Sequence, residues 1–301
     1  MNTLSIHDLR ALIRKKETTP TCSVCNTHPS CDVHHHNGHH HDNTPSNLAP
    51  ICKRCHNDHH GISDNLNELT LLTRQYSDIQ RSRIAMGNRV AAYGRLGYDV
   101  PQAVEILGEY KDLEKHTLKR IAKMLKLEPI YTSYLSKIMG VGPATAGVII
   151  SEIGDIGRFE TISALWAYCG LDVRNGAAPK RKKGEKANWN AKLRKTVIGI
   201  LVPVFVRQKG KANCFGRAYY EQCKQYYVQR DTGTITPLHI ENRARRKVGK
   251  VFLSCLWVAW RQIKELPISE PYCADKLAHI HLVTPEKWAG DGWGQDVQLK
   301  L

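Results

Sequence analysis

The sequence predicts a mostly helical protein with a small α+β domain near its amino-terminal end. Apolar residues recur at spacings of three and four between residues 66 and 125, which indicates long amphipathic helices. Cysteine and histidine are concentrated between residues 22 and 60, as is typical of a small metal-stabilised domain. We expect four parts: a metal-binding domain over 1–61, a coiled-coil or helical hairpin over 62–130, an all-helical domain over 131–266, and a tail over 267–301.

The charge of the chain indicates a polyanionic partner. Its 301 residues carry a formal net charge of +16, with a pI near 9.4, and such a basic balance favours nucleic acid. Residues 1–20 lack the apolar core of a secretion signal. The longest apolar run, 196–206, is too short to cross a bilayer. We therefore expect a cytoplasmic, nucleoid-associated protein without a membrane partner, whose cysteines outside the amino-terminal cluster are buried free thiols.

Four cysteines predict a structural zinc site. Cys22, Cys25, Cys52 and Cys55 form two C-x2-C knuckles separated by 26 residues. Each knuckle supplies two thiolates from one tight turn, and four thiolates fill the tetrahedral sphere of Zn²⁺ without an open position. A disulfide framework fits this spacing less well, because paired knuckles without a signal peptide are typical of metal ligands in a reducing compartment.

Histidines between and after the knuckles indicate a second metal site. His34 and His35 are adjacent, and His56 and His60 are four residues apart, so on a helix both rings project from one face. A histidine set leaves coordination positions for water and a phosphate oxygen, so this site could be catalytic, with Mg²⁺ or another divalent ion. The alternative is a plain zinc knuckle followed by a metal-scavenging histidine tract.

The order of these residues resembles that of the HNH (ββα-metal) endonucleases. The matching positions are Val33, His34-His35, Gly38, Asp42-Asn43, Asn47-Leu48 and the segment from Cys52 to His60. The spacing to Gly38 makes His34 and His35, rather than His35 and His36, the family pair. The resemblance implies that His34, His56 and His60 hold the catalytic metal, that His35 is the general base, and that Asn47 fixes the loop carrying His35. It also implies hydrolysis of one DNA strand, leaving 5′-phosphate and 3′-hydroxyl ends.

The apolar spacing over 66–125 predicts two antiparallel helices. Pro101 marks the start of the second helix, and the loop 94–99 reverses the chain direction. The seam suits either a simple intramolecular hairpin or a coiled coil through which the chain forms a homo-oligomer.

A glycine turn between two apolar helical patterns predicts a helix-hairpin-helix motif. Gly140 and Gly142 allow close backbone approach, and the amides of the following helix can face a phosphate. Together with E-I-G-D-I at 152–156 and A-Y-C-G-L at 167–171, this segment resembles the carboxy-terminal domain of insertion-sequence transposases that use a bridge RNA and a catalytic serine. Two departures stand out: the HNH-like segment occupies the place of that family's acidic ribonuclease-H-like domain, and no serine occurs between Ser163 and Ser254. Serine-mediated strand exchange is therefore expected to be lost.

Two basic clusters are candidates for phosphate contact. The residues are Lys180, Arg181, Lys182, Lys183 and Lys186 in one segment, and Arg243, Arg245 and Arg246 in the other. Such clusters add salt-sensitive, sequence-independent affinity for nucleic acid. The alternative is a solvated charged loop.

These patterns together predict a metal-dependent DNA endonuclease whose transposase-like helical domain grips the substrate. The expected partners are DNA and, through the resemblance to bridge-RNA transposases, an RNA. Two alternatives remain: a site-specific recombinase or transposase, which would make joined products, and a non-catalytic nucleic-acid-binding regulator built around a zinc knuckle.

Overall fold

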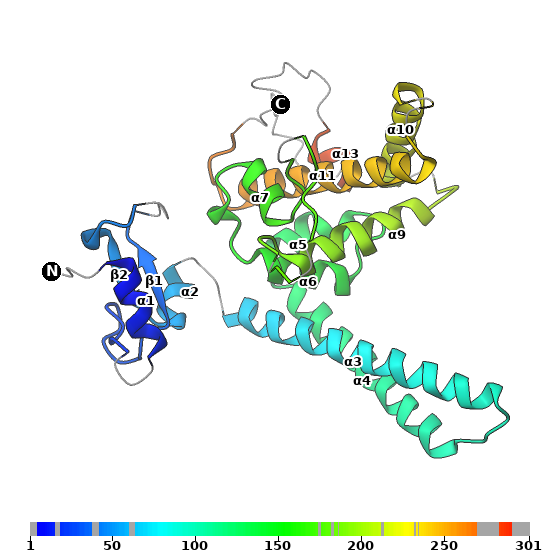
Figure 1. Cartoon of the computed structure of the whole chain (residues 1–301), viewed down its shortest axis with the longest axis horizontal. Coiled ribbons are helices and arrows are strands. Elements are labelled where there is room, and N and C mark those ends of the chain that lie inside the picture. The colour runs from blue at the N-terminus through cyan, green and yellow to red at the C-terminus, as the bar shows by residue number, and fades with distance from the viewer. Residues whose placement is uncertain are drawn as a thin grey trace. The chain divides into compact units, whose positions relative to one another are not determined.

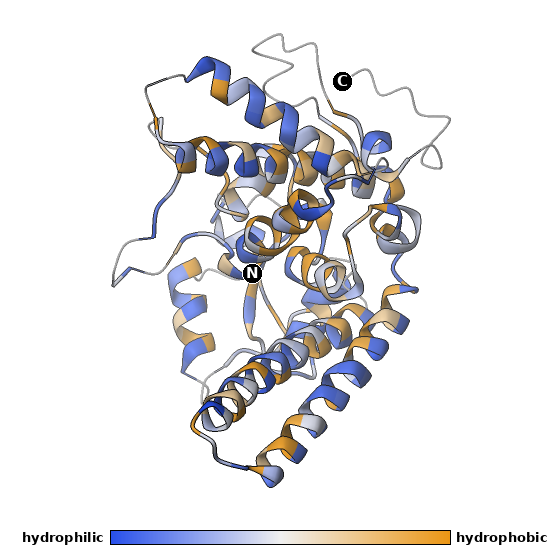
Figure 2. Ribbon diagram, turned by 90° about the vertical axis from the view of Figure 1, so that its right-hand side faces the viewer, coloured by the Kyte–Doolittle hydropathy of each residue, from blue (hydrophilic) through white to orange (hydrophobic). Residues whose placement is uncertain are grey.

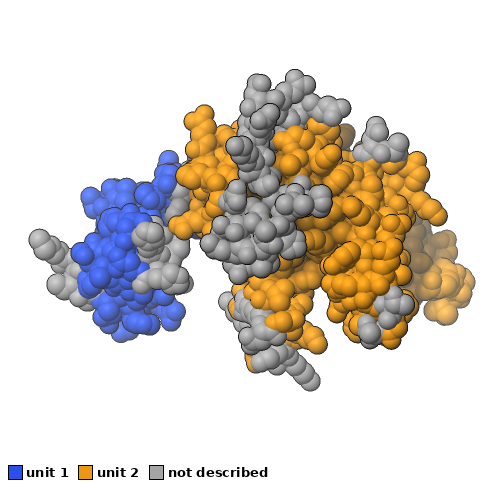
Figure 3. Space-filling view, turned by 90° about the horizontal axis from the view of Figure 1, so that it is seen from above, with its two compact units in different colours: residues 1–64 blue, residues 65–301 orange. Residues whose placement is uncertain are grey.

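The chain forms two compact units, residues 1–64 and residues 65–301, which Figure 3 shows in different colours. The computed structural model describes residues 5–15, 19–37, 42–59, 64–173, 176–181, 184–185, 187–211, 214–231, 233, 235–269 and 283–290. Helices dominate, and the described strands form a single two-stranded sheet in the first unit. The expected fold class, mostly helical with a small α+β part at the amino-terminal side, is confirmed at this level.

The first unit packs two helices against a small antiparallel sheet (Figure 1). Its elements are α1 (Ile6–Arg14), β1 (Asp32–His35), the 3₁₀ turn η1 (Pro45–Asn47), β2 (Leu48–Ile51) and α2 (Lys53–His59). The strand register pairs Val33 with Pro50 and His35 with Leu48. Val33 and Leu48 bury their side chains with Ile6 and Leu9 of α1. Because successive strand residues point to opposite faces, the other face of β1 carries Asp32 and His34.

The second unit begins with a long helical hairpin. Helix α3 spans Asp64–Arg95 and α4 spans Pro101–Leu125, and the two lie side by side (Figure 1). Apolar and polar positions alternate around both helices (Figure 2), as the sequence spacing predicted. Pro101 occupies the first turn of α4, where its missing N–H costs nothing. The predicted antiparallel hairpin is therefore present.

The remaining helices of this unit pack against one another, and α11 contacts several of them. They are α5 (Pro129–Ser133), η2 (Leu135–Lys137), α6 (Pro143–Ile153), η3 (Ile156–Arg158), α7 (Ile162–Tyr168), α8 (Ala191–Arg194), η4 (Lys195–Leu201), α9 (Val202–Arg207), α10 (Phe215–Arg230), α11 (Pro237–Ile263) and α13 (Pro285–Ala289). The second half of α11 is buried almost throughout. Trp257 donates from its indole N–H to the carbonyl of Phe159 at 2.7 Å, so the helix core is also fixed by a buried hydrogen bond.

The base of the hairpin is anchored on α6 by close packing. A Cβ on Gly147 would lie 2.9 Å from Thr73 Cγ2 and 3.1 Å from Ile121 Cγ2, so only glycine permits this approach of α6 to α3 and α4. Thr73 Oγ1 also lies 3.2 Å from Ser151 Oγ. The hairpin is thereby joined to the helical core at this end.

The apolar run 196–206 is helical, which resolves the ambiguity between helix and strand. Helix α8, the π-helical stretch η4 and α9 follow one another without a break from residue 191 to residue 207. The N–H of Val202 bonds to the carbonyl of Val197, five residues back. Pro203 follows directly and has no N–H to donate, so the wider helical register occurs just before a residue that disrupts the α-helical hydrogen-bond ladder.

Two further expectations can be compared with the structure. None of the helices in the described ranges has the length and apolar character needed to cross a membrane. Cys169, Cys214, Cys223 and Cys255 are buried free thiols as expected, but Cys31 is exposed because it lies just before β1, outside the packed layers. The remaining cysteine, Cys273, lies outside the described residues.

Candidate metal centre and nucleic-acid interface

The four knuckle cysteines converge to one point. The Sγ atoms of Cys22, Cys25, Cys52 and Cys55 all lie within 4.8 Å of one another, and those of Cys25 and Cys52 are 3.9 Å apart. A tetrahedron of thiolates around Zn²⁺ with bonds of about 2.3 Å has edges of about 3.8 Å. The arrangement therefore fits a tetrahedral ion such as Zn²⁺, held between the segment before β1 and the start of α2.

The thiols have opposed proton affinities, as expected for a group built to share a cation. Hydrogen bonds from the Thr27 side chain and from the backbone of Thr27 and His28 lower the pKa of Cys25 to about 4. Burial, together with hydrogen bonds from the neighbouring thiols, raises the pKa of Cys55 to about 12. Hydrogen bonds thus favour the thiolate at Cys25, whereas burial and the neighbouring sulfurs penalise it at Cys55, and a bound cation would remove that penalty.

Asp32 and His34 of β1 face α2. The Nδ1 atom of His56 in α2 lies 3.2 Å from Asp32 Oδ2, and the hydrogen bond from His56 is the largest cause of a lowered pKa for Asp32. The rings of His34 and His56 are 5.5 Å apart between centroids. A carboxylate on Nδ1 orients the imidazole and leaves Nε2 for another ligand, the usual support for a metal-binding histidine.

Of the three histidines predicted to hold the metal, the structure describes His34 and His56. His60 lies outside the described residues, whereas the ring of His59 is 4.1 Å from that of His34, between centroids. Among the described residues, the group of potential metal-ligand atoms that all lie within 4.8 Å of one another is formed by the four cysteines. The histidines lie near one another on the β1 face without that degree of convergence. Asp32 could have been found in the sequence, because it stands two residues before His34 and so shares its strand face.

His35 lies on the opposite face of β1 and contacts the loop before β2. It is buried, and its Nε2 lies 3.1 Å from Asn43 Oδ1. An amide oxygen only accepts hydrogen bonds, so Nε2 carries the proton in this pairing. The neutral ring then presents an unprotonated Nδ1, the form that a general base requires.

Asn47 closes the loop between the two strands. Its Oδ1 accepts from the backbone N–H of Asn37 at 3.0 Å, and its Nδ2 donates to Asn37 Oδ1 at 2.9 Å and to the carbonyl of Asp42 at 2.8 Å. The side chain is 7% exposed. One amide thus joins the end of β1 to the far side of the loop. Gly38, which set the register in the sequence, lies outside the described residues.

The two glycines of the turn before α6 differ in backbone conformation and in surroundings. Gly140 adopts φ +97°, and a Cβ there would lie 3.0 Å from Val204 Cγ1, so both backbone and packing require glycine. Gly142 is the N-cap of α6, has φ −88°, and has open space where a side chain would stand. Space is therefore open at Gly142, next to the backbone N–H groups at the start of α6. A phosphate needs such space to reach these N–H groups.

The basic positions fall into two groups. Lys180 and Arg181 are exposed, while Lys182, Lys183 and Lys186 lie outside the described residues.

The second group is engaged within the protein. Arg243 pairs with Asp231, Arg245 pairs with Glu241, and Arg246 donates to the carbonyl of Asp172. Burial lowers the pKa of Arg246. Arg243 and Arg246 therefore hold the segments at Asp231 and Asp172 against α11, whereas the Arg245–Glu241 pair lies within α11, four residues apart.

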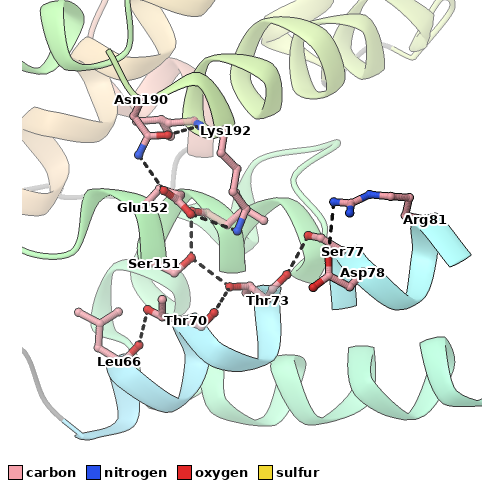
Figure 4. Close-up of polar contacts among 12 residues, drawn as sticks. Leu66, Thr70, Thr73, Ser77, Asp78, Arg81, Ser151, Glu152, Asn190 and Lys192 are labelled. Carbon is pink, nitrogen blue, oxygen red and sulfur yellow. Dashed lines mark hydrogen bonds and ion pairs between the residues drawn. The ribbon is translucent and has the colours of Figure 1, made fainter. Parts of the chain in front are cut away.

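A polar network holds the chain that follows the first basic segment (Figure 4). Asn190 donates to Glu152 Oε2 at 2.7 Å and to the hydroxyl of Tyr168 at 2.9 Å, and its Oδ1 accepts from the N–H of Leu193 as the cap of α8. Lys192 pairs with Glu152 at 3.1 Å. The start of α8 is therefore fixed to the end of α6. Sequence patterns did not indicate this network, because its members are far apart in the chain.

The comparison with known proteins gives a match within the second, helical unit. Packed helices with a glycine turn and a strongly basic charge are typical of nucleic-acid-binding proteins. Within the helical unit, residues 132–215 match the transposase IS116/IS110/IS902 family. This match indicates a transposase- or recombinase-like function on nucleic acid for that part of the chain. A search of curated proteins finds no match.

Proposed function

We propose that this protein is a metal-dependent HNH-type endonuclease that hydrolyses DNA phosphodiesters, with its transposase-like helical unit gripping the DNA. The observation that carries the proposal is the first unit itself. Its order is strand, strand, helix, with His34 of β1 beside His56 of α2 and a thiol cluster at the start of that helix. This is the arrangement expected from the resemblance to ββα-metal nucleases.

In this mechanism the residues of the first unit have separate roles. His34 and His56 would hold a divalent ion, with His60 as the third ligand suggested by the sequence and His59 as the neighbour that lies close to His34. When bound, the ion supplies positive charge that stabilises the phosphate during attack. Asp32 orients His56 through its carboxylate.

His35 takes the proton of the attacking water at Nδ1. Asn43 keeps the proton on Nε2, so Nδ1 is the basic nitrogen of the ring. Asn47 holds the loop that positions both residues.

The proposal is tested by nicking of supercoiled plasmid in the presence and absence of Mg²⁺. We expect Mg²⁺-dependent nicking by the parent chain and loss of nicking in His35→Ala, with DNA binding within about twofold of the parent because the affinity comes from the basic unit. The matched control is His7→Ala, an exposed histidine of α1 in the same unit and outside both the histidine set and the thiol cluster. Nicking by His35→Ala at the parent rate would refute the role of His35.

We propose further that Zn²⁺ occupies the thiol cluster as a structural ion. The convergence of four Sγ atoms supports this, and elemental analysis should find about one zinc per chain. Cys55→Ser is expected to lose that zinc and to unfold the first unit, because a structural site contributes its binding energy to folding. Retention of zinc in this variant would contradict the assignment.

The match to transposases supports a second candidate, a recombinase that rearranges DNA. Hydrolysis leaves free ends, whereas recombination joins strands, so the two candidates differ in their products. Sequencing of the products of a two-substrate reaction distinguishes them: joined strands support the recombinase, and ends that are only nicked support the nuclease.

We also propose that the hairpin mediates self-association. Tyr93, Leu96, Tyr98 and Val104 are each at least half exposed around its tip, and clustered exposed apolar side chains mark contact surfaces. Leu96→Glu should shift the chain to monomer in sedimentation analysis. If the parent chain is itself monomeric at high concentration, this proposal fails.

A further inference from the structure

Two cavities flank Lys195 in the second unit. One, of about 380 Å³, is bordered by α3, the start of α6 and the helix from residue 191 to residue 201. The other, of about 490 Å³, is bordered by residues 179–181, Trp189 and the same helix. Lys195 lines both. Their volumes fall in the range of about 300–1,000 Å³ that is usual for small-ligand sites.

The described linings of both cavities contain basic residues and no Asp or Glu. The cavity beside α10, in contrast, is lined by Glu221 and Glu241. Lys180, Arg181 and Lys195 are exposed, and no carboxylate contacts them within the described ranges. These three cations can therefore bind an anion without breaking an existing ion pair.

The second cavity also has an aromatic wall. The guanidinium carbon of Arg194 lies 5.2 Å from the ring centroid of Trp189. A Cβ on Gly170 would lie 2.7 Å from Trp189 Cγ, so glycine at this position, with φ +68°, lets the indole pack against the backbone. The indole and guanidinium are thus held in place before any ligand arrives, and such planes are the surfaces on which unpaired bases stack.

The ridge between the cavities is the π-helical stretch η4. Lys195 and Gly199 of this stretch are exposed, and Ile200 is 43% exposed. π-Helical turns occur frequently at functional sites. A Cβ on Gly199 would meet only Lys195 Cγ, at 3.8 Å, so this position has room for a side chain.

We propose that the two cavities form one groove that binds an unpaired polynucleotide strand, with Lys180, Arg181 and Lys195 contacting phosphates and bases entering the cavities. The charge of the groove selects a polyanion, and the Trp189–Arg194 wall selects unstacked bases, which a duplex does not offer. The inference rests on the proposed function only in requiring a nucleic-acid partner; it needs neither the first unit nor a divalent ion.

The test is fluorescence anisotropy with labelled single-stranded DNA, single-stranded RNA and duplex DNA of one sequence, without added Mg²⁺. Lys195→Glu and Gly199→Glu each place a negative charge on the ridge, and Gly199→Glu does so where space exists. Both are expected to weaken single-strand binding by about 10-fold or more, and Lys195→Glu should lower the slope of log K against log salt by about 0.7. Trp189→Ala should cost about 10-fold, and Trp189→Phe less.

The matched control is Lys287→Glu, the same charge reversal at an exposed residue of α13 outside both linings. It should leave single-strand binding within about twofold of the parent. Circular dichroism should show parental helicity for Gly199→Glu. Duplex binding should change by less than about threefold in the ridge variants, because the duplex bases stay stacked.

The outcomes are distinct. Tight, ridge-dependent binding of either unpaired strand supports the groove, and the tighter of the two identifies DNA or RNA. Unchanged single-strand binding in both ridge variants, or equal losses for duplex and single strand, overturns it. Absence of nicking in the parent chain together with ridge-dependent binding would refute the nuclease and leave the groove standing.

Discussion

Asn47→Ala should strongly destabilise the first unit. Its side chain makes three hydrogen bonds, two to Asn37 and one to Asp42, and is almost completely buried. At about 1 kcal/mol for each hydrogen bond, the expected loss is about 3 kcal/mol, since Ala leaves the Asn37 N–H and the Asp42 carbonyl without their partner. In a unit of 64 residues this corresponds to a fall in Tm of about 12–24 °C.

The assay is scanning calorimetry of the zinc-loaded full chain, with hydrogen exchange to assign the transition to residues 37–47. Asn43→Ala is the matched control: it makes the same truncation in the same loop at an exposed residue with one side-chain contact, to His35. It should lower the Tm by no more than about 4–8 °C. If Asn47→Ala and Asn43→Ala had the same Tm, within a few degrees of that of the parent, Asn47 would not be the residue that stabilises the loop.

The remaining predictions concern the metal ligands and the hairpin. Asp32→Asn should lower Mg²⁺-dependent nicking by about 10- to 100-fold and raise the Mg²⁺ concentration needed, because the partner of a metal-binding histidine is lost; an unchanged Mg²⁺ titration would contradict this. Separate alanine variants of His59 and His60 should differ in Mg²⁺ dependence, and the one with the larger defect is the third ligand. Burial raises the pKa of Glu114, but hydrogen bonds from Gln80 and Arg83 outweigh it and lower the pKa overall. The stability from this carboxylate is therefore fully present above its unfolded pKa of about 4.3 and is lost as the pH falls through its lower folded pKa; acid titration of helicity should show this loss in the parent and not in Glu114→Gln.

Local patterns in the sequence predicted much of the secondary structure. Two C-x2-C knuckles imply convergent thiols because the chain geometry of a knuckle leaves few alternatives, and the structure brings all four sulfurs together. The hairpin followed from helical spacing and from Pro101, both of which act over a few residues.

Features that depend on distant contacts were not predicted. The nearness of His59 to His34 was not predicted, since it depends on how α2 lies against β1. Arg245 pairs with Glu241 four residues earlier on the same helix, a local contact. The partners of Arg243 and Arg246, at positions 231 and 172, became evident only from the packing of α11. The bond between Asn190 and Glu152 likewise spans 38 residues. Such pairings carry no periodic signal.

Trp288 of α13 has a consequence for how the protein is made. Its indole is 4% exposed and packs against the rings of Phe205, Phe215 and Phe252, with centroid separations of 5.2–5.4 Å. It lies 25 residues beyond the end of α11 at Ile263. At a synthesis rate of about 5–20 residues per second, a ribosome needs about 1–5 s to add that stretch, during which the three phenylalanines lack their cover. A translation product that stops before Trp288 would thus display an aromatic surface to chaperones and proteases, which could tell truncated chains from finished ones.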